Sequence, residues 1–279
     1  MSEVRRNVVY GMYSGLALLM DAHLPESSNG LGVVHVSGSG WSAPLDLDAR
    51  PLKESGHVEI EGRPLVDAGY TLFTVNHRAL PRFRFPAQIE DMQRAVRFVR
   101  HHAAEYRIDP SRIGAVGGSS GGHLVALLGV LDGEGDPTSE SVIDRESARV
   151  QCVVARAAPT DFLHMPHSTS RGLLLGTDSL DSGDLDSEAH GKAVDASPAH
   201  RATADSAPML LLHGDADDVV PFEQSVRMER ALREADVPVK LIRIPGAGHG
   251  PGILRAEGQN VDYVREMVAW LDEHLGGVR

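Results

Sequence analysis

The sequence predicts an α/β protein with a doubly wound, mostly parallel sheet, and three observations support this. Short, almost continuously apolar runs recur along the chain, as expected for parallel strands that are covered on both faces. Helical patterns lie between several of these runs, which gives the βαβ rhythm of such sheets. The length of 279 residues, with 42% hydrophobic and 24% charged residues, is ordinary for one such domain.

The strand candidates of the parallel part of the sheet are residues 32–36, 70–75, 112–116, 152–155, 209–212 and 239–244. Upstream of them, residues 8–10 and 16–20 predict a pair of strands that turns between Gly11 and Gly15. The alternative for this segment is a signal peptide, but it lacks a small-residue cleavage site after its apolar stretch. We therefore expect strands there and a cytoplasmic protein.

Two helices follow from the spacing of apolar residues. In residues 87–106 these recur at steps of three and four and form one stripe: Ile89, Met92, Val96, Val99, Ala103 and Tyr106. Acidic residues lie in the first turns and basic residues late, an order that suits the helix dipole. A last helix over residues 261–275 is expected to turn Val264, Met267, Val268 and Leu271 inward.

Two longer stretches interrupt this rhythm. Residues 132–147 are polar and contain glycine and proline, which predicts a surface loop. Residues 163–204 have a mixed composition with an acidic patch between Asp178 and Glu188, and they are a candidate lid. No repeat or linker divides the chain, so residues 1–279 are expected to form a single domain.

The composition excludes several classes of partner. A formal charge of −12 repels phosphate backbones, so no nucleic-acid partner is expected. No apolar run approaches the roughly 18 residues of a membrane helix, so no membrane span is expected. The single cysteine, Cys152, allows neither an intrachain disulfide nor a cysteine-based zinc site. The sequence fixes no oligomeric state and is compatible with a homodimer.

A glycine-rich turn between a predicted strand and a helix holds the strongest chemical signal. Residues 113–128 read IGAVGGSSGGHLVALL, and two overlapping G-x-S-x-G patterns place either Ser119 or Ser120 on the turn. Glycines on both sides of such a serine remove collisions with its strained backbone. We favour Ser119 because Val116 is then the last strand residue before the turn. A phosphate-binding loop fits less well, because the P-loop lysine and the G-x-G-x-x-G spacing are absent.

The loops after the last two predicted strands offer an acid and a base for a serine nucleophile. The segment MLLLHGDADDVVP presents Asp215, Asp217 and Asp218 as candidate acids. The segment IPGAGHG places His249 between glycines, where a purely structural histidine has little to pack against. The chain order serine, acid, histidine is the one expected with a G-x-S-x-G turn.

The other histidines are assigned to packing or to the surface. His213 ends a predicted strand and is expected to be a hydrogen-bonding core residue. The pairs His101–His102 and His164–His167 lack an acidic or histidine partner at ligand spacing, so no metal site is predicted.

Donors for a developing oxyanion are the third requirement of such a site. One is expected from the backbone N–H of the residue after the nucleophile, Ser120. The others are expected from the loop after an early strand, where HVSGSGW spans residues 35–41. Small residues in this loop let backbone N–H groups face a substrate.

Together these segments resemble the α/β-hydrolase superfamily, and within it the hormone-sensitive-lipase-like and bacterial esterase/lipase-like (BD-FAE-like) branch. The resemblance covers about residues 30–275 and is strongest over residues 85–128, which contain FPAQIEDMQRAVRFVR and YRIDPSRIGAVGGSSGGHL. APTDF, ASP, HGDADDVVPFEQS and GAGHG are further matches. The resemblance implies an α/β-hydrolase fold with helices on both faces of the sheet and short cap or lid insertions.

The resemblance also implies roles for single residues. It makes Ser119 the nucleophile, which settles the register of the turn, and His249 the base. It selects Asp217 as the orienting acid, because the family pattern H-G-x-x-D-x-x-V-P begins at His213. It implies no cofactor.

This chain departs from the family pattern at two places. The oxyanion loop is usually H-G-G-G-W and here is SGSGW, so the leading histidine and one glycine are replaced. The backbone N–H groups of Gly38, Ser39 and Ser120 remain the expected donors, because a main-chain N–H survives a change of side chain. Gly118 stands before the nucleophile, where many relatives carry aspartate.

The expected activity is that of a serine carboxylesterase acting on small-molecule esters through an acyl-enzyme, with short acyl chains favoured because a long apolar lid is absent. Trp41, Phe162 and Leu163 are the candidate substrate contacts. An amidase, exopeptidase or arylformamidase-like hydrolase is the main alternative, because the triad does not distinguish acyl oxygen from acyl nitrogen. The length leaves no room for the large β domain usual in such peptidases, which favours the ester. A catalytically inactive binding module is the remaining alternative, motivated by the altered oxyanion loop.

Overall fold

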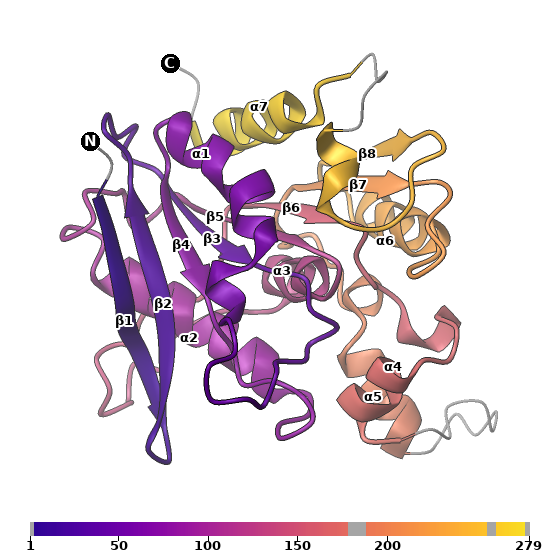
Figure 1. Ribbon diagram of the computed structural model, residues 1–279, viewed down its shortest axis with the longest axis horizontal. Helices are drawn as coiled ribbons and strands as arrows, with labels where there is room; N and C mark the ends of the chain where they lie inside the picture. The colour runs from indigo at the N-terminus through magenta and orange to yellow at the C-terminus, as the bar shows by residue number, and fades with distance from the viewer. Residues whose placement is uncertain (1–2, 178–187, 256–260, 277–279) are drawn as a thin grey trace.

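A mostly parallel sheet with helices against both faces forms the centre of the molecule (Figure 1). The computed structural model describes residues 3–177, 188–255 and 261–276. Within them the strands are β1 (Glu3–Tyr13), β2 (Leu16–Leu24), β3 (Gly32–Val36), β4 (Thr71–Val75), β5 (Ile113–Gly118), β6 (Cys152–Arg156), β7 (Met209–Gly214) and β8 (Val239–Ile244). Their order in the sheet is β1-β2-β4-β3-β5-β6-β7-β8. The pairs β1–β2 and β2–β4 are antiparallel, and every later pair is parallel.

The helices of the described residues divide between the two faces of the sheet. They are α1 (Arg63–Asp67), α2 (Ala87–His101), α3 (Ser120–Val130), α4 (Thr169–Leu175), α5 (Glu188–Asp195), α6 (Glu223–Glu234) and α7 (Tyr263–Gly276). One core cluster contains buried residues of α2, α3 and α6, and the other contains those of α1 and α7. The sheet is therefore a middle layer, as the doubly wound prediction requires.

The buried strands supply both clusters in alternation. Val33 and Leu210 contribute to the α1/α7 cluster, whereas Val34 and Leu211 contribute to the opposite one. Successive strand residues point to opposite faces, so a strand covered on both sides must be apolar at every position. This explains why the central strands appear in the sequence as continuous apolar runs.

The parallel register brings several strand ends to one edge of the sheet. Val36 at the end of β3 is paired with Gly117 of β5, and Gly118 is paired with Arg156 of β6. Gly214 at the end of β7 is paired with Ile244 of β8. The loops that follow these strands therefore emerge side by side, and they contain the residues for which the sequence predicted chemistry.

Element boundaries differ from the sequence prediction in two instructive places. The N-terminal strands are longer than expected, and β1 runs through Gly11 and returns at a turn of Ser14 and Gly15. The helix expected over residues 87–106 ends at His101, and a chain of turns continues to Arg107, whose φ is 56°. Apolar residues in those turns remain buried, so the apolar stripe outlasts the helix.

The candidate lid, residues 163–204, contains α4 and α5, and α4 contacts α5. Most of its acidic patch, including Asp178, Asp181, Asp184 and Asp186, lies outside the described residues. Residues 132–147 form turns and bends without a helix or strand, as predicted. Among the described residues, no helix combines the length and the apolar character needed to cross a membrane.

Candidate active site

The predicted nucleophile lies on a strained turn between β5 and α3. Ser119 has φ 54° and ψ −125°, a backbone conformation that residues other than glycine rarely adopt. The neighbouring glycines are sterically required. A Cβ atom on Gly117 would lie 2.6 Å from the carbonyl oxygen of Gly121, and one on Gly121 would lie 2.0 Å from that of Val36. The turn can thus form only with glycine at these positions, with Ser119 at its apex.

The structure brings the predicted base and acid to this serine. His249 Nε2 lies 2.9 Å from Ser119 Oγ, and His249 Nδ1 lies 2.7 Å from Asp217 Oδ2. The three side chains come from loops after β5, β7 and β8, so the common strand edge assembles them. The arrangement is a continuous chain of hydrogen bonds from a hydroxyl through an imidazole to a carboxylate.

Asp217 is held as a carboxylate by its surroundings. Its side chain has no exposed surface, and burial alone would raise its pKa. Hydrogen bonds from His213, His249 and the backbone N–H groups of Val219 and Val220 outweigh burial and hold the pKa of Asp217 well below its ordinary value. An ionised acid at this position can accept the Nδ1–H of His249 and stabilise its cation.

His213 is a core hydrogen-bonding residue, as expected from the sequence. It is fully buried, and its Nδ1 lies 2.7 Å from Ser225 Oγ. Its Nε2 lies 2.9 Å from the carbonyl oxygen of Val220 and 3.2 Å from Asp217 Oδ2. Both of these neighbours are acceptors, so Nε2 carries the proton and His213 acts as a donor to Asp217.

The other two candidate acids lie elsewhere. Asp215 accepts hydrogen bonds from Arg243 Nε at 2.7 Å and from the backbone N–H of Gly246 at 2.6 Å. These contacts tie the loop after β7 to the loop after β8. Asp218 is exposed. Of the three aspartates, Asp217 is the one that lies within hydrogen-bond distance of His249.

The oxyanion loop requires a correction. The backbone N–H of Ser39, an expected donor to substrate, donates instead to Ser120 Oγ at 2.9 Å. Ser120 can accept this hydrogen bond because the first turn of α3 packs against the end of β3, where Gly121 lies close to the carbonyl oxygen of Val36. Within the described residues, the hydrogen bonds include none from the backbone N–H of Gly38 or of Ser120. Two of the three expected donors are therefore free in this structure.

The predicted substrate contacts also require a correction. Phe162 has no exposed surface and Trp41 is 3% exposed. Both pack against the ring of His123, and Trp41 Nε1 donates to His123 Nδ1 at 3.0 Å. These two side chains are therefore packed in the interior and present almost no surface to a substrate. Leu163 is partly exposed, so only this member of the predicted set presents surface.

His123 itself is a neutral structural residue. Its Nδ1 accepts from Trp41, and its Nε2 donates to the carbonyl oxygen of Ala196 at 2.7 Å. Complete burial lowers its pKa to about 4, although the hydrogen bond to Ala196 opposes this. The ring therefore joins the oxyanion loop to the segment after α5 without carrying charge.

A second histidine cluster lies near the end of β6. His164 and His200 both contact Asp161, at 2.7 Å and 3.1 Å. The expectation that His164 has no acidic or histidine partner was wrong, because Asp161 lies three residues away and His200 comes from a distant segment. The three side chains could offer ligand atoms to a metal. Arg227 lies 3.5 Å from the same carboxylate, and its positive charge opposes a bound cation.

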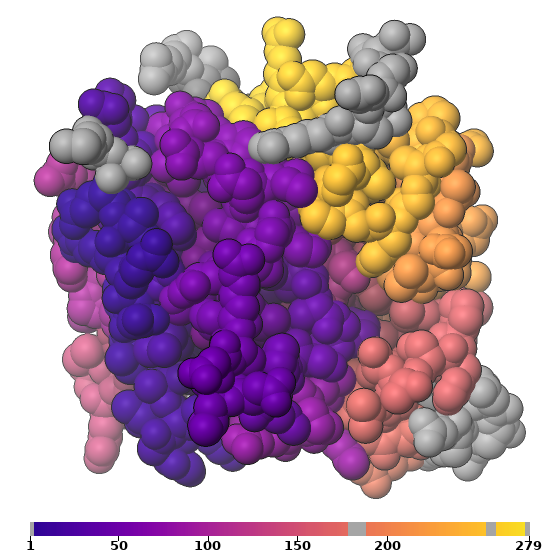
Figure 2. Space-filling view, in the orientation of Figure 1, coloured from indigo at the N-terminus to yellow at the C-terminus, as the bar shows by residue number. Residues whose placement is uncertain are grey.

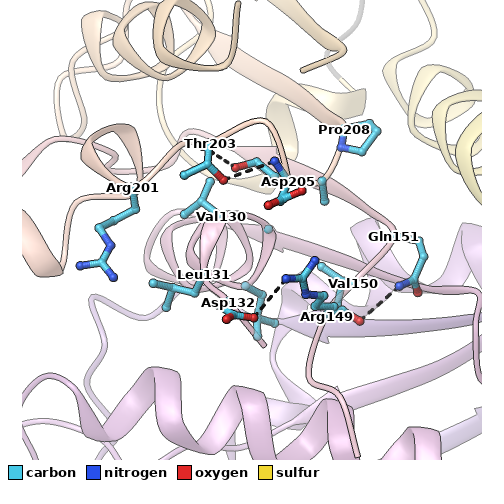
Figure 3. A pocket seen from close by; sticks show the side chains of 14 residues that line it. Val130, Leu131, Asp132, Arg149, Val150, Gln151, Arg201, Thr203, Asp205 and Pro208 are labelled. Atoms are coloured by element: carbon cyan, nitrogen blue, oxygen red, sulfur yellow. Dashed lines mark hydrogen bonds and ion pairs between the residues drawn. The ribbon is translucent and has the colours of Figure 1, made fainter. Parts of the chain in front are cut away.

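The turn at Ser119, between β5 and α3, is called the elbow below. A cavity of about 530 Å³ lies at the opposite end of α3 from this elbow (Figure 3). It is lined by Val130, Asp132 and Arg149 and by residues from the segment before β7. Arg149 and Asp132 form an ion pair of 3.1 Å within it. Because α3 has 11 residues and spans roughly 16 Å, this cavity is separate from Ser119.

Sequence reasoning missed a buried ion pair behind the elbow. Arg156 Nε lies 2.6 Å from Glu61 Oε1, and both side chains are almost fully buried. A Cβ atom on Gly118 would lie 1.9 Å from Arg156 Nη2, so this guanidinium occupies the space next to the residue before Ser119. Gly118 in place of the aspartate of relatives was the available signal, since a side chain there would collide with Arg156.

Taken together, the sheet order, the strained turn after β5 and the loops of β7 and β8 define an α/β-hydrolase fold. The chain belongs to the BD-FAE family, whose model matches residues 20–232. This confirms the family resemblance that the sequence motifs suggested.

Named relatives of this chain include ester hydrolases. It is 29% identical over 191 residues to the probable carboxylic ester hydrolase LipM of Mycobacterium tuberculosis, covering 68% of this chain and 44% of LipM. It is 30% identical over 205 residues to the esterase LipC of the same organism, covering 68% of this chain and 47% of LipC. The chain thus spans less than half the length of these relatives.

Solved structures match over nearly the whole chain. A truncated carbohydrate esterase from gut microbiota superposes with a TM-score of 0.81 at 30% identity, covering 98% of this chain and 96% of that one. An acetyl ester-xyloside bifunctional hydrolase from Caldicellulosiruptor lactoaceticus superposes with a TM-score of 0.81 at 25% identity, covering 98% and 97%.

Proposed function

We propose that the protein is a serine carboxylesterase that hydrolyses small carboxylic esters. The observation that carries this proposal is the hydrogen-bonded sequence Ser119–His249–Asp217 at an elbow of α/β-hydrolase geometry. The named ester hydrolases among its relatives support the same reaction class.

In the first half of the reaction, Ser119 Oγ attacks the ester carbonyl while His249 Nε2 takes its proton. Asp217 holds the imidazole in the tautomer that accepts this proton and stabilises the imidazolium. The free backbone N–H groups of Gly38 and Ser120 stabilise the oxyanion, each by roughly 3 kcal/mol in comparable sites. His249 then returns the proton to the leaving alcohol, and the acyl group remains on Ser119.

In the second half, water replaces the alcohol and the same groups act again. His249 removes a proton from the water as its oxygen attacks the acyl carbonyl. The tetrahedral intermediate collapses, Ser119 recovers its proton from His249, and the carboxylic acid leaves. The chain's own residues supply every proton transfer in this cycle.

The lid proposal concerns residues 163–204. A Cβ atom on Gly40, in the oxyanion loop, would lie 3.2 Å from Ser170 Oγ in α4. The described part of this segment at α4 therefore borders the oxyanion loop, and we infer that α4 limits the space for the acyl group. Small acyl groups fit this proposal, and the neighbouring solved structure described as an acetyl ester-xyloside hydrolase supports it.

A panel of p-nitrophenyl esters beside the matched anilide tests the proposal. We expect acetate and butyrate to be hydrolysed faster than octanoate, and p-nitroacetanilide to be hydrolysed far more slowly. Ser119→Ala should abolish all of these activities. Ser120→Ala keeps the nucleophile and should therefore retain ester hydrolysis. Faster cleavage of the anilide would favour an amidase, and full activity of Ser119→Ala would refute the proposed mechanism.

A further inference from the structure

The segment before α1 reaches the back of the active site. It contains a π-helical turn, Val58–Gly62. Such turns are rare in proteins overall, and those that occur often lie at functional sites. This turn contacts the segment Pro251–Arg255 that follows His249. In Figure 2 the purple and yellow parts of the chain meet on one face, as this contact requires.

The turn supplies the buried carboxylate that fixes Arg156. Besides Arg156, Glu61 contacts His35 Nε2 at 3.1 Å. Burial alone would raise the pKa of Glu61, but the charge of Arg156 and the hydrogen bond with His35 outweigh it and hold this pKa well below its ordinary value. Arg156 is thus anchored, and its Nη2 lies 3.2 Å from Nδ1 of a further histidine, His57.

His57 lies beside the oxyanion loop and the predicted nucleophile. Its Cε1 atom and the Cβ atom of Ser119 both lie 2.9 Å from the point that a Cβ atom on Gly38 would occupy. The His57 side chain is 17% exposed, so it is not sealed in the interior. Ser55 fixes the segment by a 2.7 Å hydrogen bond to Ser37 Oγ, in the loop itself.

Arg156 determines which nitrogen of His57 carries a proton. A guanidinium can only donate, so Nδ1 of His57 must accept, which leaves the proton of the neutral ring on Nε2. Glu61 Oε2 is farther from Nδ1, at 3.4 Å. A proton on Nδ1 would face the Nη2 hydrogen of Arg156. Nε2 is bonded to Cε1, the atom that approaches Gly38, and it is therefore an N–H donor next to the oxyanion loop.

We propose that His57 Nε2 donates a hydrogen bond to the oxyanion that forms on the substrate carbonyl. This rests on the proposed esterase function and extends it. The backbone N–H of Ser39 is engaged with Ser120. His57 supplies an imidazole from a different segment, and Arg156 and Glu61 are its positioning residues.

Two nearly isosteric substitutions test this role. His57→Gln keeps an N–H donor, whereas His57→Met has a similar length and volume without one. An oxyanion donor acts in the transition state, so His57→Met should lower kcat for p-nitrophenyl acetate by about 10²-fold with little change in KM. His57→Gln should recover at least part of this loss. Affinity for a trifluoromethyl ketone, which forms a tetrahedral adduct with the serine, should fall in parallel with kcat.

The control is His101→Met, on α2 and remote from the site, which should leave kcat unchanged. Thermal denaturation establishes that each variant is folded. If His57→Met does not fold, the pair His57→Asn and His57→Leu replaces the first pair. If Ser119→Ala inactivates the enzyme but His57→Met and His57→Gln have equal kcat values, the proposed role of His57 is overturned and the esterase function stands. A wild-type protein without ester hydrolysis would instead refute the proposed function.

Discussion

Asp217 is the residue whose chemistry depends most on its surroundings. It accepts hydrogen bonds from two histidines and two backbone N–H groups, and none of its side-chain surface is exposed. A carboxylate so placed is a fixed negative charge beside His249. It can stabilise the imidazolium without taking its proton.

We expect Asp217→Asn to lower kcat by about 10⁴-fold, because an amide cannot stabilise the imidazolium and favours the wrong tautomer of His249. Steady-state hydrolysis of p-nitrophenyl acetate measures the effect. Asp218→Asn is the matched control, since this neighbour is exposed, and it should retain activity. Comparable losses in both variants would contradict the selection of Asp217.

At this scale the sequence could predict residues with a local signature. Ser119 is marked by its glycines, and His249 by a glycine-rich loop after a strand. Glu61 and Arg156 have no such signature, because they are 95 residues apart and only the fold brings them together. Trp41 and Phe162 were placed in the substrate pocket, but aromatic residues near a site also serve as its packing, and only burial distinguishes the two roles.

The contact between α3 and β3 is the element-level feature that shapes the elbow. Gly121, in the first turn of α3, passes so close to β3 that no Cβ atom can fit beside the carbonyl of Val36. The helix can therefore begin directly under the oxyanion loop, and Ser120 can reach Ser39. Close backbone approach is one of the few roles that require glycine.

Gly121→Ala should accordingly lower the free energy of unfolding by at least about 1–3 kcal/mol, because the added methyl group would overpack against the backbone of Val36. Gly191→Ala, in α5, should instead raise it by about 0.5–1 kcal/mol, because nothing lies within 4 Å of its added methyl group and alanine favours helix. Urea denaturation of both variants gives the two values. A neutral Gly121→Ala would show that α3 can move away from β3.

Element prediction succeeded where apolar periodicity is clean. The runs 32–36 and 239–244 match β3 and β8 to the residue. α6 was not predicted, because only part of its buried face is apolar: Met228 and Leu232 share that face with the polar residues Gln224 and Ser225. The helical segment at 58–67 contains Gly62 and Pro64, residues that usually argue against a helix.

At the scale of the whole molecule, buried histidines couple stability to pH. His123 has a pKa of about 4 in the folded protein because burial disfavours its charged form. Below its ordinary pKa of 6.5, the unfolded chain binds a proton at His123 that the folded chain does not. Stability is therefore complete above pH 6.5 and is lost as the pH falls toward 4.

We expect the wild type to lose about 2 kcal/mol more stability than His123→Gln between pH 7 and pH 5, since glutamine can make similar hydrogen bonds without titrating. Chemical denaturation at several pH values, compared between the two proteins, isolates this contribution from those of other groups. Parallel pH profiles would mean that His123 titrates normally in the folded protein.

The global architecture could be predicted because parallel strands covered on both faces impose a recognisable apolar rhythm. The same parallel topology also made it possible to predict that the loops with the candidate site residues meet at one edge of the sheet. The sequence could not show which backbone N–H groups of the oxyanion loop form hydrogen bonds within the protein, because Ser39 and its acceptor Ser120 are 81 residues apart. Such contacts depend on distances of a few tenths of an ångström that no sequence pattern encodes.

The role of Ser119 as the nucleophile of an ester hydrolase can be tested directly. The protein is treated with diisopropyl fluorophosphate, and the adduct is located by peptide mass spectrometry. We expect one adduct per chain, on Ser119, with ester hydrolysis lost in proportion to labelling and no adduct in Ser119→Ala. An adduct on another residue, or a fully labelled protein that still hydrolyses esters, would contradict it.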